Sequence, residues 1–175
     1  MSAIPTLLAD ALTAVINTAE AASTFAPFEF TARRSYPDWD DDFKDLPTHT
    51  GGVSVDVVFV SSGASGGDMV ELDSVASVDT DLGIDIAVRR RLDKAGDKEA
   101  NGRLKNSAVD PLVNLVEQLH ILFTEDRMTA IALQSGVDAN WLDTSVRTYC
   151  DYKRLREGVF LGVVRVRFNV SKAVS

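Results

Sequence analysis

Residues 157–170, near the C-terminus, constrain the fold more than any other stretch of this sequence. From Gly162 onward, apolar and polar residues alternate strictly. The apolar row is Val164, Val166, Phe168 and Val170, and the polar row is Arg165, Arg167 and Asn169. A period of two, with β-branched and aromatic residues on one side, predicts a half-buried β-strand. The rest of the chain must therefore cover one side of this strand and tolerate charge on the other.

The same alternation predicts further strands at 28–36, 53–60, 82–92 and 141–152, and one or two short strands at 69–78. Apolar residues at helical spacing predict an amphipathic helix over 4–22 and a second one over 111–123. Ser107 or Asp110 is expected to cap the second helix, with Pro111 in its first turn. A shorter helix is expected over 125–134, a loop over 93–106 and a turn over 153–158.

The order of these elements is helix, strands, helix, strands, and successive strands usually pair as antiparallel neighbours. We therefore expect an α+β fold with a central antiparallel β-sheet, covered on one face by two main α-helices. The chain has 175 residues, which suggests a single domain over 1–175 with a core of its own.

Charge and cysteine content narrow the possible functions. The net charge of −8 argues against non-specific nucleic-acid binding, which needs clustered Lys and Arg. Cys150 is the only cysteine, so no intrachain disulfide is possible, and we expect it to act as a small apolar residue in a strand. No apolar run is long enough to span a membrane, and the N-terminus lacks a basic signal region, so a cytoplasmic site of assembly is expected.

Residues 38–45, DWDDDFKD, form the first candidate site. Asp38, Asp40 and Asp42 match the first half of a calcium-binding loop, but Phe43 replaces the required Gly and His49 replaces the bidentate Glu. A solvated acidic loop, or a contact with a basic partner, is favoured. Trp39 and Phe43 are either apolar anchors of a protein interface or side chains that pack back onto the domain.

Charged residues on the polar rows of several strands form the second candidate. If these strands are neighbours, one sheet face is a mixed lattice of Arg and Asp, in which each cross-strand pair contributes about 0.2–1 kcal/mol. Such a face is either solvated or used between subunits or around a lumen. Together, the two candidates give these interface residues: Trp39, Asp40, Asp42, Phe43, Asp56, Asp85, Arg89, Arg91, Arg165 and Arg167.

No nucleophile, acid–base or P-loop motif is present, so no catalytic residue, cofactor or metal ligand is assigned and the protein is not expected to be an enzyme. One alternative from another class remains, a small metal-dependent enzyme that uses the Asp-rich loop. Another is a ligand-binding module.

The pattern of elements resembles the tail terminator, or tail-completion, proteins of long-tailed bacteriophages. The resemblance rests on the N-terminal helix, Arg33 and Arg34 in a strand, the basic end of the strand at 88–92, one long helix at 111–123, and the EGVF stretch at 157–160. It implies a virion structural protein in the tail or neck, assembled in the host cytoplasm. It also implies an α+β fold with a central antiparallel sheet.

This resemblance further implies a homohexameric ring that caps the tail tube, stops its polymerisation and joins it to the head-side connector. The implied partners are other copies of the chain, the tail tube protein and a head-completion protein, with DNA passing through the lumen without specific binding. Negative walls repel phosphates, so an acidic chain suits such a conduit. Another head-tail connector component, such as a head-completion or neck protein, and a tube-like protein remain as alternatives.

Overall fold

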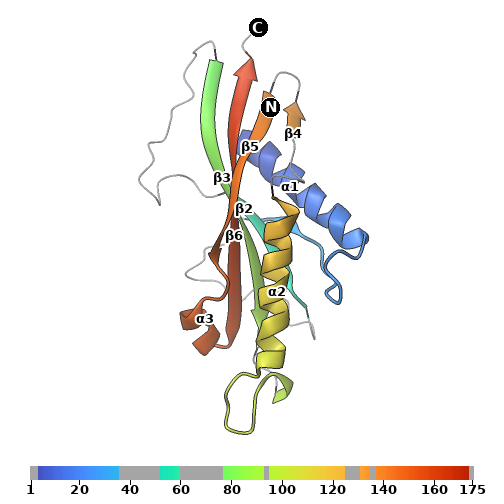
Figure 1. The fold of residues 1–175 in the computed structure, drawn as a ribbon, viewed down its shortest axis with the longest axis vertical. Coiled ribbons are helices and arrows are strands. Elements are labelled where there is room, and N and C mark those ends of the chain that lie inside the picture. Colours follow the sequence, from blue (N-terminus) through green and yellow to red (C-terminus); the bar gives the residue numbers. More distant parts are fainter. Residues whose placement is uncertain are drawn as a thin grey trace.

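The computed structural model describes residues 4–35, 52–59, 77–92, 95–124, 131–134 and 137–173. These residues form an α+β fold in which a single sheet is covered by helices (Figure 1). The elements in chain order are α1 (Ile4–Ala21), β1 (Arg33–Arg34), β2 (Ser54–Phe59), β3 (Ser77–Arg91), the short 3-10 helix η2 (Ala95–Asp97), α2 (Asn106–Leu122), β4 (Ile131–Gln134), β5 (Val137–Thr148), α3 (Tyr152–Arg156) and β6 (Val159–Ala173).

The described strands form one sheet with the order β1-β2-β3-β6-β5-β4. Every neighbouring pair is antiparallel except β1 and β2, which run parallel. The expected central antiparallel sheet in a single α+β domain is therefore confirmed.

The C-terminal strand β6 lies in the middle of this sheet, as its sequence pattern requires. It pairs with β3 along its whole length, from Val159 to Ala173, and with β5 on its other side. The predicted apolar row is buried, and Val164, Val166 and Phe168 are completely inaccessible to solvent. The alternation of this strand therefore defines the two faces of the whole sheet.

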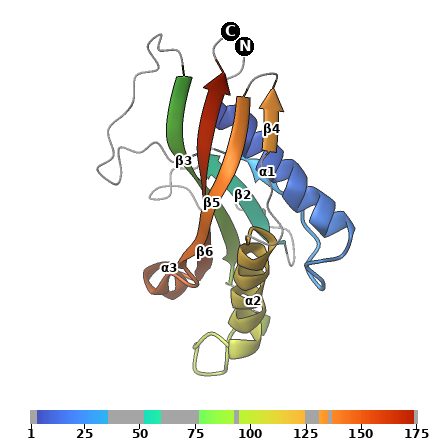
Figure 2. The same cartoon turned by 45° about the horizontal axis from the view of Figure 1, so that its top comes forward.

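Helices α1 and α2 both lie on the apolar face. Leu8, Leu12 and Ile16 of α1 join the same buried cluster as Leu115 and Leu119 of α2. Helix α1 contacts β1 and β2 and also β4, which stands at the opposite end of the strand order. The sheet therefore curls around α1, and both views show β4 beside this helix (Figures 1 and 2).

Two of the expected elements are wrong. The strand expected over 28–36 is reduced to Arg33–Arg34, because the chain before it turns to bury Phe25 and Phe30, whose ring centroids are 5.4 Å apart. The helix expected over 125–134 is wrong at its C-terminal end, where β4 pairs with β5. A short apolar run suits either structure, and the available edge of β5 decides in favour of a strand.

The boundaries of two helices also differ from expectation. Helix α2 begins at Asn106 after Lys105, so neither Ser107 nor Asp110 is its cap and Pro111 lies inside the helix. The turn expected over 153–158 contains the one-turn helix α3, whose backbone N–H groups at Lys153 and Arg154 are capped by the Asp151 carboxylate. In the part of the chain that is described, no helix has the length and apolar character needed to cross a membrane.

Candidate functional site

The face of the sheet opposite α1 and α2 carries a continuous set of charged side chains, called here the polar face. It follows from the strand register, which places Asp85 of β3 opposite Arg165 of β6, and Asp56 of β2 opposite Ala87 of β3. The residues whose ion pairs and hydrogen bonds define the polar face are Arg33, Ser54, Asp56, Asp81, Asp85, Arg89, Asp143, Arg147, Arg165, Arg167 and Asn169.

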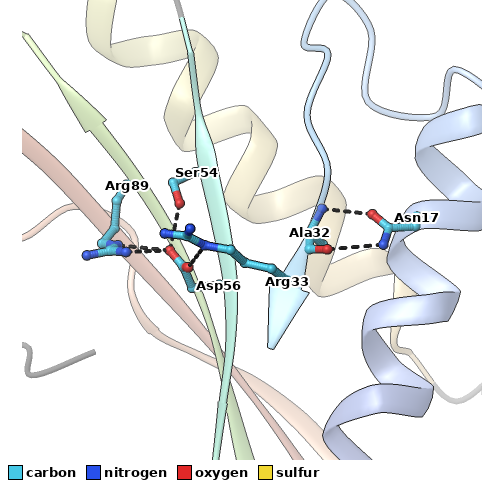
Figure 3. A network of polar contacts seen from close by, with 6 residues as sticks. All are labelled: Asn17, Ala32, Arg33, Ser54, Asp56 and Arg89. Atoms are coloured by element: carbon cyan, nitrogen blue, oxygen red, sulfur yellow. Dashed lines mark hydrogen bonds and ion pairs between the residues drawn. The ribbon is translucent and has the colours of Figure 1, made fainter. Parts of the chain in front are cut away.

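Asp56 is the centre of the first cluster on the polar face (Figure 3). Its Oδ1 accepts a hydrogen bond from Arg33 Nε at 2.9 Å, and its Oδ2 accepts bonds from Arg89 Nε at 3.0 Å and Nη2 at 2.7 Å. The Ser54 hydroxyl donates to the same Oδ2 at 2.8 Å. Asp56 and Arg89 are buried, so this cluster fixes β1, β2 and β3 to each other.

Asp85 is the centre of the second cluster. Arg165 Nε donates to its Oδ1 at 2.6 Å and Arg165 Nη2 to its Oδ2 at 2.9 Å, which is the bidentate geometry that suits a guanidinium and a carboxylate. Arg147 of β5 lies at 3.6 Å from the same carboxylate. Three strands therefore share one negative charge. A Cβ added at Gly83 would lie 3.8 Å from Cδ and Nε of Arg165, which is ordinary van der Waals contact.

The third cluster is exposed to solvent. Arg167 of β6 forms a two-armed ion pair with Asp143 of β5, in which its Nε lies 2.9 Å from Oδ1. The hydrogen bond from Arg167, together with its positive charge, lowers the pKa of Asp143 and opposes the weaker effect of burial. The same contact raises the pKa of Arg167. Asn169 extends the row by donating to Asp81 at 3.1 Å.

The predicted lattice of Arg and Asp is thus confirmed for five of the candidate residues: Asp56, Asp85, Arg89, Arg165 and Arg167. Arg91 is in the same row of β3, opposite Val159. Four other candidates, Trp39, Asp40, Asp42 and Phe43, lie outside the described residues. Whether any of these residues contacts a partner stays a prediction.

Six members of the polar face are absent from the predicted set, and two of these, Asp143 and Arg147, depend on an irregular strand. Both belong to β5, where the register shifts between Trp141 and Asp143 and again between Val146 and Thr148. The alternation of residues 141–152 places Arg147 on the polar row of the strand. The position of Asp143 depends on a bulge, and a bulge cannot be located from alternation alone. Arg34 differs from its neighbour Arg33, because it reaches Asp10 of α1 at 2.9 Å, towards the helices.

The polar face can bind a partner through its exposed hydrogen-bond donors, because its central carboxylates are already paired with guanidinium groups. Asp56, Asp85 and Asp143 each hold a guanidinium, so none of the three is free to act as a general base. Cys150 lies just after β5 and is half-buried, and burial raises the pKa of its thiol. A protonated thiol is a weak nucleophile. Among the described residues, no three His, Cys, Asp or Glu side chains are grouped to hold a metal ion.

The outermost side chains of the polar face are mostly arginines. Arg33, Arg147 and Arg167 have side chains that are 55%, 48% and 50% exposed, although each also pairs with a carboxylate. Arginine keeps unused N–H donors after it binds one carboxylate, so such residues can contact a second acceptor. The polar face therefore combines a buried, fixed inner layer with an exposed outer layer that can meet an acidic partner.

A strand edge that no other described strand covers lies next to the polar face. Strand β2 pairs with β3 only between Ile84 and Arg89, whereas β3 continues back to Ser77 in its pairing with β6. Within the described residues, no strand pairs with the other side of β3 from Ser77 to Gly83. Unpaired N–H and C=O groups along such an edge can pair with another chain. Comparisons of the chain with protein-family models, with curated proteins and with solved structures find no match.

Proposed function

We propose that this protein is a ring-forming virion structural protein, a tail terminator that caps the tail tube of a long-tailed bacteriophage and joins it to the head-side connector. One side of β3, from Ser77 to Gly83, has no partner among the described strands and adjoins the arginine-bearing polar face, and this observation carries the proposal. In a ring, each subunit binds one neighbour with one surface and the other neighbour with a second, different surface. The edge of β3 and the polar face together form one of these two surfaces.

The contacts within the polar face support a rigid subunit. Arg89 and Asp56 are buried and bonded across β2 and β3, and Arg165 and Asp85 are bonded across β3 and β6. These pairs hold three central strands in register without help from a partner. A rigid strand frame keeps the angle between neighbouring subunits constant, which a ring that closes requires.

The charge of the chain also agrees with a DNA conduit. A net charge of −8 repels phosphates from the protein as a whole, so DNA can pass without being held. The described arginines of the polar face pair with aspartates, which limits their pull on a phosphate backbone. Binding between subunits by strand edges and paired charges is compatible with weak affinity for DNA.

Light scattering after size-exclusion chromatography, combined with negative-stain imaging at near-physiological salt, tests this proposal. A tail terminator is expected to form closed rings of uniform mass, with six subunits as the expected number. Long filaments would favour the tube-like alternative, and a monomer at all protein concentrations would overturn the ring.

A charge-reversal pair of variants locates the contact. Arg167→Glu changes an exposed member of the polar face and is expected to weaken the ring. Lys153→Glu changes the net charge by the same amount on exposed α3, away from the polar face, and serves as the matched control. Equal loss of rings in both variants would show a general charge effect, and unchanged rings in both would exclude the polar face as the interface.

A further inference from the structure

A second surface of the protein is a pocket of about 490 Å³ between the segment that precedes α2 and the short helix α3. Lys98 and Arg103 line it from the first side, and Tyr152, Leu155, Arg156 and Glu157 from the second. The pocket lies at the end of the sheet where β3 stops and β6 starts, since the Leu92 N–H donates to Gly158 C=O at 2.7 Å. None of its lining residues belongs to the polar face.

The walls of this pocket are fixed by hydrogen bonds. Lys98 and Leu104 form an antiparallel bridge, and the Glu99 N–H donates to Arg103 C=O at 2.7 Å. The Arg103 N–H donates to Asn101 Oδ1 at 2.9 Å. Within the loop expected over 93–106, residues 95–105 therefore form a small ordered hairpin. The backbone from which Lys98 and Arg103 project is therefore fixed before a ligand arrives, which lowers the entropy lost on binding.

The pocket carries positive charge that the rest of the described chain does not balance. Seven other arginines pair with carboxylates: Arg33, Arg34, Arg89, Arg147, Arg154, Arg165 and Arg167. Lys98, Arg103 and Arg156 differ, because no carboxylate of the described residues lies within ion-pair distance of them. Glu157 lines the pocket but already accepts a hydrogen bond from Arg154 at 3.2 Å. Three such cations around one hollow favour an anionic occupant.

The apolar part of the pocket indicates a protein segment as the occupant. Tyr152 is 77% exposed and stands beside Leu155 on α3. Tyrosine and arginine are among the residues enriched at the positions that contribute most to the affinity of protein interfaces. An inorganic anion would gain no favourable contact from the apolar ring of Tyr152. The pocket therefore suits a segment that carries both carboxylates and aromatic side chains.

Residues 38–45 of this chain have that composition. The sequence DWDDDFKD places five aspartates around Trp39 and Phe43. We propose that the pocket binds the acidic segment 38–45 of a neighbouring copy of this chain, so that each subunit presents a basic pocket to one neighbour and an acidic segment to the other. This inference rests on the proposed ring and names a contact within it. A head-to-tail pairing of unlike surfaces is the type that closes into rings.

A peptide experiment tests the pocket without requiring a ring. The probe is an acetylated and amidated peptide of residues 36–47, titrated by calorimetry onto the full chain whose five aspartates at 38–45 are replaced by asparagine. We expect saturable binding that weakens as salt rises. Arg103→Glu and Arg156→Glu should each weaken it about tenfold, and Lys153→Glu, at an exposed position outside the pocket, should leave it nearly unchanged.

Three outcomes of this titration overturn the proposal. The first is equal binding of a control peptide with asparagine in place of its aspartates. The second is an equal effect of Lys153→Glu and Arg156→Glu. The third is displacement of the acidic peptide by inorganic phosphate at concentrations equal to those of the peptide, which would make the pocket an oxyanion site. The neutral substitutions Arg103→Gln and Arg156→Gln repeat the test if a charge-reversed variant fails to fold.

A mixing experiment separates contact between copies from contact within one chain. The variant with both Arg103→Glu and Arg156→Glu lacks the pocket charge, and the variant with five asparagines lacks the acidic segment. Neither should form rings, and a mixture should form dimers, because one complementary pocket and segment remain in each pair. Absence of dimers despite peptide binding would place the contact within one chain and overturn the proposal.

The two proposals fail in different ways. If the wild-type protein forms rings and both variants also form them, the pocket inference fails and the proposed function stands. If the wild-type protein is a monomer but the peptide binds to the pocket with the expected charge dependence, the proposed function fails and the pocket's specificity for the acidic segment stands.

Discussion

Asp85 and Arg165 are joined by two hydrogen bonds of 2.6 Å and 2.9 Å, although 80 positions separate them in the chain. Their side chains are 7% and 17% exposed. Asp143 and Arg167 form the same kind of two-armed pair on the same sheet, with 41% and 50% exposure. The protein therefore contains two Asp–Arg pairs of the same two-armed geometry and unequal burial, and the buried carboxylate also has Arg147 at 3.6 Å.

Asp85→Asn should destabilise the protein much more than Asp143→Asn. Removal of one partner from a buried pair leaves an uncompensated charge and costs about 3 kcal/mol or more. An exposed pair contributes at most about 1 kcal/mol, because water and salt screen it. The free energies of unfolding come from urea denaturation of the two variants and the wild type.

A double replacement of Asp85 by Asn and Arg165 by Met gives the control for this comparison. It should recover part of the stability lost in Asp85→Asn, because no unpaired guanidinium then remains between β3 and β6. Equal losses in Asp85→Asn and Asp143→Asn would contradict the claim that burial decides the contribution of each pair.

The sequence predicts the parts of this fold that depend on local period. Strand β6 and helix α1 follow from alternation and from helical spacing, and the polar row of Arg165 and Arg167 follows with them. Strand β4 does not, because its four residues have no period of their own and gain a partner only from β5. Asp143 could not be assigned to Arg167 for a related reason, since a bulge in β5 sets that contact. Long-range register is a property of the assembled sheet.

Gly162→Ala should destabilise the protein by about 1–3 kcal/mol, because the site has no room for a methyl group. A Cβ at this position would lie 2.4 Å from Val116 Cγ2 and 3.0 Å from the Tyr149 carbonyl oxygen, so α2 packs directly on the backbone of β6. Thermal and urea unfolding measure the loss. Gly96→Ala, where an added Cβ meets nothing within 4 Å, should stay within about 0.5 kcal/mol of the wild type.

Combining Val116→Ala with Gly162→Ala tests whether the clash with the Val116 side chain causes the loss of stability. The doubly substituted protein should be more stable than the sum of the two single changes implies, since the smaller side chain at position 116 frees the space that the added methyl group needs. Strict additivity of the two changes would instead indicate that the close approach to the Tyr149 carbonyl oxygen, and not the one to Val116, causes the loss.

The hydrogen bond between Tyr149 and Glu117 predicts that the free energy of unfolding falls at high pH. The Tyr149 hydroxyl donates to Glu117 Oε2 at 2.6 Å, and this hydrogen bond to a carboxylate is the main reason that the pKa of Tyr149 is raised. A raised pKa in the folded state means that the bond stabilises the protein below the unfolded tyrosine pKa of about 10 and is lost as the pH rises through the folded value. The bond joins the end of β5 to α2.

Spectrophotometric titration of the tyrosines checks this prediction. The chain has three tyrosines, and Glu117→Gln should lower the midpoint of one of them towards the ordinary range. Tyr149→Phe should remove that same transition and leave the others in place. An unchanged titration curve in Glu117→Gln would show that the carboxylate does not hold the phenol proton in solution.

Asn17 of α1 serves as a side-chain partner for the strand edge at β1. The Ala32 N–H donates to Asn17 Oδ1 at 2.7 Å, and Asn17 Nδ2 donates to the Ala32 carbonyl at 3.1 Å, as Figure 3 shows. The amide thus reproduces the two hydrogen bonds that a neighbouring strand would offer. It fastens the residue before Arg33, and so the Arg33–Asp56 contact, to the first helix.

Asn17→Asp and Asn17→Ala should each cost about 1–2 kcal/mol but should differ in hydrogen exchange. The aspartate variant keeps an acceptor for the Ala32 N–H and loses only the donor, so that amide should stay protected, whereas the alanine variant lacks both bonds and should expose it. Thr18→Ala removes an exposed hydroxyl that bonds only within α1, to the Ala14 carbonyl, and should change stability by less than about 0.5 kcal/mol. Fast exchange at Ala32 in the wild-type protein would contradict the proposed clamp, because the amide would then be open without any substitution.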